Sequence, residues 1–377
     1  MRPIQMVDLI AQYQSIKEAV NASVLQTIES GAFINGPAVQ NFKASLESYL
    51  DVKHVIPCAN GTDALQIALM ALGLEPGDEV IVPAFTYVAT AEVIALLRLK
   101  PIMVDVDPAT FNITAAIVKA ALSPKTKAVV PVHLFGQSVD MQPLIELSEK
   151  HGFYLVEDNA QAIGADYIFD NGRRQKTGTL GHVGCTSFYP SKNLGAFGDG
   201  GALFTNDTDL AAKLKKIASH GQSKRYYHDC IGVNSRLDSV QAAILNIKLK
   251  KLDDYAQARQ SLASYYNQNL ADITALTLPK LQPNSTHVYH QYTLKVSGGQ
   301  RDALQHFLKE RGVPSMIYYP VPLQLQEAFK GMGNTKGLIL PVTAQLCEEV
   351  LSLPMHTEMD VEQRHYICDC INAFFKP

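Results

Sequence analysis

Short apolar runs alternate with amphipathic helical patterns from about residue 50 to about residue 205. Ala64–Met70 is one such helical segment, and it lies between two of the apolar runs. The runs are rich in Val and Ile, which is typical of strands buried on both faces. Their alternation with helices predicts an α/β fold whose sheet is mostly parallel and covered on both faces. The predicted strands are His54–Pro57, Glu79–Val82, Pro101–Asp105, Ala128–Val132, Tyr154–Glu157, Thr186–Phe188 and Ala202–Thr205.

The pattern changes toward the C-terminus. Asp170-Asn171-Gly172 predicts a hairpin turn ahead of the strand at 186–188. Residues 234–270 contain neither Gly nor Pro and have a helical pattern, which predicts a long helix that links two domains. The remaining residues mix helical and strand patterns. The sequence therefore predicts a large domain at residues 1–250 and a smaller C-terminal α+β domain at residues 251–377.

Composition narrows the classes of protein. A hydrophobic content of 47% supports a large core, and a net charge of −3 without a Lys/Arg run argues against a nucleic-acid partner. Apolar stretches end before the ~20 residues of a membrane span, and the N-terminus lacks the apolar segment of a signal peptide. We therefore expect a soluble cytoplasmic protein. The six cysteines (58, 185, 230, 347, 368 and 370) include no Cys-x-x-Cys pair, so we expect reduced thiols and no metal site.

The most informative stretch runs from Ser187 through Lys192 to Gly195. A lysine in a glycine-rich turn, after a short strand and a hydroxyl residue, suits an amine that forms a Schiff base. A solvent-exposed loop lysine is the alternative for any single Lys. That alternative is weakened here because small residues, ending in Gly200-Gly201, follow the lysine. The pattern indicates pyridoxal phosphate (PLP) as the cofactor.

Asp158 ends another apolar run and is followed three residues later by Gln161. A carboxylate beside a pyridine nitrogen favours its protonated form, which makes the ring an electron sink. Gln161 lies on the same helical side, within reach of the ring hydroxyl. Taken alone, Asp158 has a simpler interpretation as a residue that caps the next helix.

Two further segments follow predicted strands. Gly61 and Thr62 open a helix, where free N–H groups and the helix dipole favour a phosphate, although ordinary capping of the helix explains them equally well. Tyr87 follows the next strand and offers a ring to stack on a flat cofactor, although core packing is the better interpretation of this segment taken alone. The dinucleotide fingerprint Gly-x-Gly-x-x-Gly does not follow the first strand, so a Rossmann-type oxidoreductase is disfavoured.

These motifs resemble those of the DegT/DnrJ/EryC1/StrS family of PLP-dependent nucleotide-sugar aminotransferases. The resemblance extends from about Ile34 to His356. It implies an aspartate-aminotransferase-like (type I) fold and a homodimer whose active sites lie between subunits. The residues that carry it are Asn60–Leu65, Glu157–Gln161, Ser187–Lys192, Gly198–Gly201 and Asn234–Asp238.

The resemblance also implies roles for single residues. Lys192 and Asp158 would be catalytic, as the Schiff-base lysine and the partner of the pyridinium nitrogen. Tyr87 would stack on the ring and Gln161 would bind its hydroxyl. The cofactor phosphate would be held by Gly61, Thr62 and Ser187, with Asn234 of the partner subunit.

The segments at 220–228 and 234–243 resemble the subgroup that aminates C3 of the sugar. We expect transfer of the amino group of L-glutamate to a nucleotide-linked 3-oxo sugar, first of all UDP-2-acetamido-2-deoxy-3-oxo-glucuronate, a precursor of surface polysaccharides. A dTDP-3-oxo-6-deoxyhexose is the alternative substrate, and a PLP-fold sensor without turnover is the alternative class. Arg236, Tyr318 and Tyr319 are the expected substrate-binding residues; Tyr318 stands where a His-Tyr-Pro segment of the subgroup has histidine.

Overall fold

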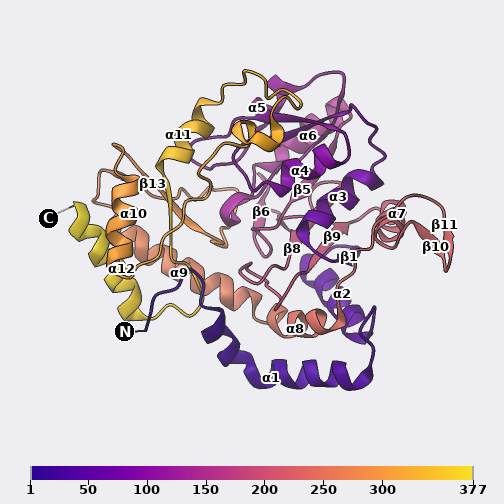
Figure 1. The fold of residues 1–377 in the computed structure, drawn as a ribbon, viewed down its shortest axis with the longest axis horizontal. Coiled ribbons are helices and arrows are strands. Elements are labelled where there is room, and N and C mark those ends of the chain that lie inside the picture. The colour runs from indigo at the N-terminus through magenta and orange to yellow at the C-terminus, as the bar shows by residue number, and fades with distance from the viewer. Residues whose placement is uncertain (1, 376–377) are drawn as a thin grey trace.

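A computed structural model describes residues 2–375 and contains a seven-stranded sheet at its centre (Figure 1). The strand order is β1-β9-β8-β5-β4-β2-β3. All neighbouring pairs are parallel except those of β9, which is antiparallel to both β1 and β8. The strands are β1 (His54–Cys58), β2 (Glu79–Pro83), β3 (Lys100–Val104), β4 (Thr126–Val129), β5 (Tyr154–Asp158), β8 (Val183–Ser187) and β9 (Gly201–Thr205).

Helices cover both faces of this sheet because successive strand residues point to opposite sides. Val80 and Val82 belong to one hydrophobic cluster, with α3 (Gly61–Ala71), α4 (Ala89–Leu96) and α7 (Thr208–Ala218). Ile81, between them, packs on the other face. The helices of that face are α5 (Ala115–Ala121) and α6 (Met141–His151), and, at the β1 end, α2 (Pro37–Leu50) and α8 (Ser239–Leu249). This arrangement confirms the predicted α/β fold.

Three segments lie outside the sheet. Helix α1 (Leu9–Ser30) packs on α8 through a small cluster that includes Val20 and Ile244. The predicted turn at 170–172 joins β6 (Asp166–Ile168) to β7 (Arg174–Lys176), which confirms the hairpin. A second hairpin, β10 (Gln222–Lys224) with β11 (Tyr227–His228), projects from the molecule beyond α7 (Figure 1).

A three-stranded antiparallel sheet and a separate hydrophobic cluster form the other end of the molecule. Both described ends of the chain lie there, near α9 and α12 (Figure 1). The strands are β12 (Leu276–Thr277), β13 (Tyr292–Val296) and β14 (Val350–Leu353), and the helices are α9 (Leu252–Leu270), α10 (Arg301–Glu310) and α12 (Val361–Phe375). Helix α11 (Pro341–Glu349) packs instead on a cluster of the large sheet, through Leu346 and Cys347. None of the helices between residues 2 and 375 has the length and apolar character needed to cross a bilayer.

Three predicted elements differ clearly from the structure. The strand expected at Ala128–Val132 is β4, which begins and ends earlier, at Thr126–Val129. The strand expected at Thr186–Phe188 is β8, which spans Val183–Ser187. The prediction begins too late because the small residues of Val183-Gly184-Cys185 are not typical of a strand. The long helix expected at 234–270 is wrong. Its first residues are extended, since Asn234 pairs with Ser219 and Asp238 with Ile34, and the rest is divided into α8 and α9.

The division into domains at residues 250 and 251 stays a proposal. Packing crosses that boundary in both directions. Ile4 contributes to the cluster around the three-stranded sheet, whereas Leu323 and Phe329 pack into a cluster of the seven-stranded sheet.

Candidate active site

The predicted site residues lie where strands of the large sheet end. Asp158 is the last residue of β5 and Ser187 the last of β8, and these strands are parallel neighbours. The segment that contains Gly61 follows β1, and the segment that contains Tyr87 follows β2. Ligands of open α/β sheets bind beyond the carboxyl ends of the strands, so the sheet gathers these side chains at one edge.

A tight backbone junction forms a candidate phosphate site. Asn60 caps α3 by accepting a hydrogen bond of 2.8 Å from the N–H of Asp63. A Cβ on Gly61 would lie 2.7 Å from Cβ of Ser187, and a Cβ on Gly201 would lie 2.5 Å from the Asn60 carbonyl. Glycine thus brings the N-terminus of α3 directly onto the end of β8. The first-turn N–H groups and the hydroxyls of Thr62 and Ser187 are the donor set that a phosphate needs.

Lys192 lies in the loop between β8 and β9, where its N–H donates to the Tyr189 carbonyl (2.8 Å). Burial lowers the pKa of Lys192 to about 8, and the charge of Asp158 partly opposes this shift. A lowered pKa supplies the neutral amine that attacks a carbonyl carbon. The neighbouring Asn193 anchors the loop by donating to the Val288 carbonyl (2.9 Å).

The carboxylate of Asp158 is held by two donors. The Thr90 hydroxyl donates to Oδ2 (2.8 Å) and the Ala160 N–H donates to Oδ1 (3.1 Å). The Asp158 backbone is fixed as well, because its N–H donates to the Pro131 carbonyl and its carbonyl accepts from the His133 N–H. These contacts fix the direction of the carboxylate, which would face the ring nitrogen of a bound pyridine.

Behind Asp158, a buried hydrogen bond between two side chains fixes the strand end. His133 and Glu157 are both fully buried, and their side chains are 2.8 Å apart. The Val139 N–H donates to Nδ1 of His133, so the Nε2 proton points to Glu157. Glu157 also accepts from the N–H groups of Gly178 and Leu180. This network holds the loop before β8 against β5, and with it the relative positions of Asp158 and Ser187.

Gln161 bridges two segments. Its Oε1 accepts from the Phe135 N–H (2.8 Å), and its Nε2 donates to the Tyr319 hydroxyl (3.1 Å). The Tyr319 ring packs edge-on against Phe85 and lies 6.5 Å, centre to centre, from the ring of Tyr87. Tyr87 itself is 58% exposed, which leaves its ring available to stack on a ligand.

Asn234 and Arg236 do not join this group within one chain. Between residues 2 and 375, no hydrogen bond or ion pair connects either side chain to Lys192 or Asp158. Asn234 is exposed, and Arg236 lines a cavity of about 500 Å³ together with Lys43 and Lys215, between α2 and α7. Tyr318 is partly buried beside Tyr319, with ring centres 6.0 Å apart.

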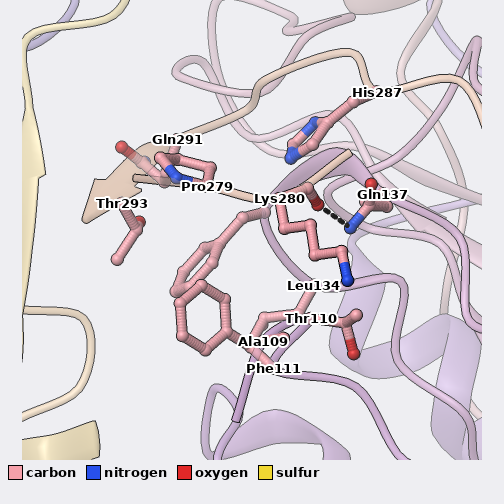
Figure 2. A pocket seen from close by; sticks show the side chains of 11 residues that line it. Ala109, Thr110, Phe111, Leu134, Gln137, Pro279, Lys280, His287, Gln291 and Thr293 are labelled. Carbon is pink, nitrogen blue, oxygen red and sulfur yellow. Dashed lines mark hydrogen bonds between the residues drawn. The ribbon is translucent and has the colours of Figure 1, made fainter. Parts of the chain in front are cut away.

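A second cavity, lined by residues that include Phe111 and Leu134, holds only about 10 Å³ (Figure 2). Gln137 forms part of its wall by donating to the Lys280 carbonyl (3.1 Å), and His287 and Thr293 line it as well. A space of this size accommodates about one water molecule, so this cavity is not the site of a cofactor.

Sequence reasoning missed Thr90, Phe135 and His290. His290 lies just before β13. His290 is buried, and burial, then the charges of Lys192 and Arg259, lower its pKa well below the usual value. In the sequence, His290 is marked only by its place between Tyr289 and Gln291, and such a combination is too common to indicate a site.

The observed residues fit PLP. A nucleophilic amine with a lowered pKa, a carboxylate held by two hydrogen-bond donors and a phosphate cradle that an added Cβ would fill all lie at one sheet edge. Fold and site together define a fold type I PLP-dependent transferase. The chain belongs to the DegT/DnrJ/EryC1/StrS aminotransferase family, which it matches over residues 14–372. It is accordingly a PLP-dependent aminotransferase that acts on sugars.

Three relatives illustrate the range of the family. The chain is 43% identical to the UDP-2-acetamido-2-deoxy-3-oxo-D-glucuronate aminotransferase of Pseudomonas aeruginosa, over 97% of this chain and 98% of that protein. It is 37% identical to the dTDP-3-amino-3,4,6-trideoxy-alpha-D-glucose transaminase of Streptomyces venezuelae (98% and 96% covered). It is also 44% identical to a protein of Geobacillus stearothermophilus named a pleiotropic regulatory protein (99% of each).

Solved structures agree with the fold. A DegT DnrJ EryC1 StrS aminotransferase from Brucella abortus superposes with a TM-score of 0.93 at 41% identity, over 99% of this chain and 100% of that one. DesV of S. venezuelae, in complex with a ketimine intermediate, gives 0.94 at 36% identity over the whole of both chains. NtdA of Bacillus subtilis, with bound cofactor PMP, gives 0.88 at 30% identity (99% and 83% covered).

Proposed function

We propose that this aminotransferase moves the amino group of L-glutamate to C3 of a nucleotide-linked 3-oxo sugar, with UDP-2-acetamido-2-deoxy-3-oxo-glucuronate as its first substrate. The observation that carries the proposal is the pKa of Lys192, which burial lowers to about 8 and on which the charge of Asp158 also acts. The relative of P. aeruginosa, named for that sugar, supports the substrate.

Each residue of the site has a separate task in this proposal. The N–H groups of Gly61 and Thr62, with the Ser187 hydroxyl, bind the cofactor phosphate, and the Tyr87 ring packs against the cofactor face. Asp158 keeps the pyridine nitrogen protonated, while the Thr90 hydroxyl orients its carboxylate. When bound, PLP withdraws electrons from the carbon next to the transferred nitrogen.

Lys192 moves the proton. Its amine, once it is free of the cofactor, takes a proton from the donor's Cα and later delivers one to C3 of the sugar, as a positioned base and acid. A group with a pKa of about 8 exchanges protons efficiently near neutral pH, whereas the usual lysine pKa of 10.5 leaves the amine almost fully protonated there.

We further propose a homodimer with shared sites, in which Asn234 of the partner subunit completes the phosphate site and Arg236 of the partner subunit meets the sugar. Three features support it. Asn234 is exposed, the hairpin β10–β11 projects from the chain, and Tyr226 and Tyr227 on it are 76% and 64% exposed. Large exposed apolar side chains gathered on one projection are typical of an interface.

The substrate is tested by mixing glutamate-treated enzyme with matched 3-oxo sugars and measuring amino-sugar formation by mass spectrometry. We expect the UDP-3-oxo-glucuronate derivative to react fastest. Faster reaction of the dTDP-3-oxo-6-deoxyhexose would replace the first substrate with the second, which the S. venezuelae relative represents. Equal rates for UDP sugars with and without the carboxylate would remove the uronate from the proposal.

A regulator without turnover is the second candidate, because the relative of G. stearothermophilus has a regulatory name. Both candidates bind PLP, so the cofactor does not separate them. Turnover does: release of an amino sugar over many cycles per subunit contradicts the regulator, and a protein that takes the amino group from glutamate but gives it to none of the sugars supports it.

A further inference from the structure

Tyr319 is carried into the site by the segment that returns from the three-stranded sheet. Met316 pairs with Ser352 of β14, and seven residues later the Leu323 N–H donates to the Ala84 carbonyl (3.1 Å), just after β2. Between these two anchors the Tyr319 ring packs against Phe85. Its hydroxyl is thus held at the edge of the large sheet where the cofactor residues lie.

The direction of the Gln161 hydrogen bonds determines what the Tyr319 hydroxyl does. The Phe135 N–H donates to Oε1 of Gln161, so the other end of the amide, the Nε2 donor, faces Tyr319. The Tyr319 oxygen is therefore the acceptor in that bond, and its own proton is not used there. Within residues 2–375, no acceptor is hydrogen-bonded to this O–H.

The hydroxyl also keeps its proton. Burial raises the pKa of Tyr319 above the usual value, the hydrogen bond from Gln161 opposes this, and the negative charge of Asp158 raises it further. A phenol in this state donates a hydrogen bond throughout the neutral pH range. An acceptor placed beside Gln161, on the side of the site that faces Asp158, would receive it.

We propose that Tyr319 binds the cofactor rather than the sugar, by donating its hydroxyl proton to the oxygen substituent on the PLP ring, next to the amide of Gln161. This inference rests on the proposed function, since it needs PLP joined to Lys192. A donor to that oxygen stabilises its negative charge. The proton shared with the neighbouring Schiff-base nitrogen is then held less tightly, so Tyr319 shifts the protonation of the cofactor toward lower pH.

The test is a spectrophotometric pH titration of the PLP-loaded protein. Tyr319→Phe keeps the ring that packs on Phe85 and removes only the O–H. We expect the midpoint of the visible band to move up by about one pH unit. Gln161→Leu should move it in the same direction, and the double variant should move it by less than the sum, because the two side chains act together.

Tyr154→Phe is the matched control, since Tyr154 lies at the opposite end of β5 and its loss should leave the titration unchanged. An unchanged midpoint in Tyr319→Phe, with a raised KM for the sugar, would overturn the inference and return Tyr319 to the substrate. If the wild-type protein shows no titrating visible band, the proposed function fails, and the inference with it.

Discussion

Burial and the charge of Asp158 have opposite effects on the protonation of Lys192. Burial favours the neutral amine of Lys192, and the carboxylate of Asp158 favours its charged form. With a pKa of about 8, the neutral fraction of Lys192 rises with pH and levels off above that value. The rate at which the apo-protein takes up PLP should therefore rise through pH 8 and then become constant.

Asp158→Asn separates two roles of one carboxylate. Removing the charge lowers the pKa of Lys192, so the midpoint of PLP uptake should move to lower pH. Turnover should fall by about a hundredfold, because the ring nitrogen loses its partner. Stopped-flow uptake and steady-state rates measure both effects in one preparation. A midpoint that moves to higher pH, or near-normal turnover, would contradict the role given to Asp158.

At this scale the sequence predicts the residues that stand in local motifs. Asp158 and Gly61 lie at the ends of strands that the sequence predicts well, Lys192 follows a strand predicted only in part, and the structure places all three at one sheet edge. Thr90 lies 68 positions from Asp158, and Tyr319 lies 158 positions from Gln161. No local pattern marks Thr90, and the resemblance that marks Tyr319 does not predict its contact with Gln161, because both contacts exist only after the sheet has formed.

At the scale of elements, the junction of α3 and β8 determines the phosphate cradle. A Cβ on Gly61 would be 2.7 Å from Cβ of Ser187, so Gly61→Ala must push the helix away from the strand end. We expect about tenfold weaker PLP binding, since overpacking of this kind costs about 1–3 kcal/mol. Fluorescence titration of the apo-protein measures the change in Kd.

Gly172→Ala is the matched control for that variant. Gly172 lies in the β6–β7 turn with φ of +81°, and an added Cβ there has nothing within 4 Å. The control should lower stability slightly through backbone strain and leave the Kd for PLP unchanged. Equal losses of affinity in both variants would indicate a general effect on folding and would remove the cradle from the argument.

The same scale shows where sequence patterns fail. The strand pattern of β8 is hard to recognise because the strand contains small residues. At Gly184 only glycine fits, since a Cβ there would lie 1.8 Å from the Gly178 carbonyl. The helix predicted at 234–270 begins at Ser239, since residues 234–238 pair with distant backbone at Ser219 and Ile34. Tertiary pairing overrides a helical pattern in this segment, and it leaves Asn234 exposed.

At the scale of the whole molecule, the proposed dimer predicts complementation between two inactive variants. In a mixed dimer of Lys192→Ala and Asn234→Ala chains, one site has an intact lysine and an intact partner asparagine. Equal mixing should restore about a quarter of wild-type activity, because half of the dimers are mixed and each has one intact site. Activity that stays at the level of the separate variants, despite exchange shown by native mass spectrometry, would contradict the shared site.

The most direct measurement is the absorbance spectrum of the PLP-loaded protein before and after L-glutamate, with Lys192→Ala as the control. The account predicts a visible band in the wild-type protein that glutamate bleaches, and no such band in the variant, since Lys192 is the amine with the lowered pKa beside Asp158. A visible band that persists in Lys192→Ala would contradict the assignment of the lysine. A wild-type band that glutamate leaves unchanged would contradict glutamate as the donor.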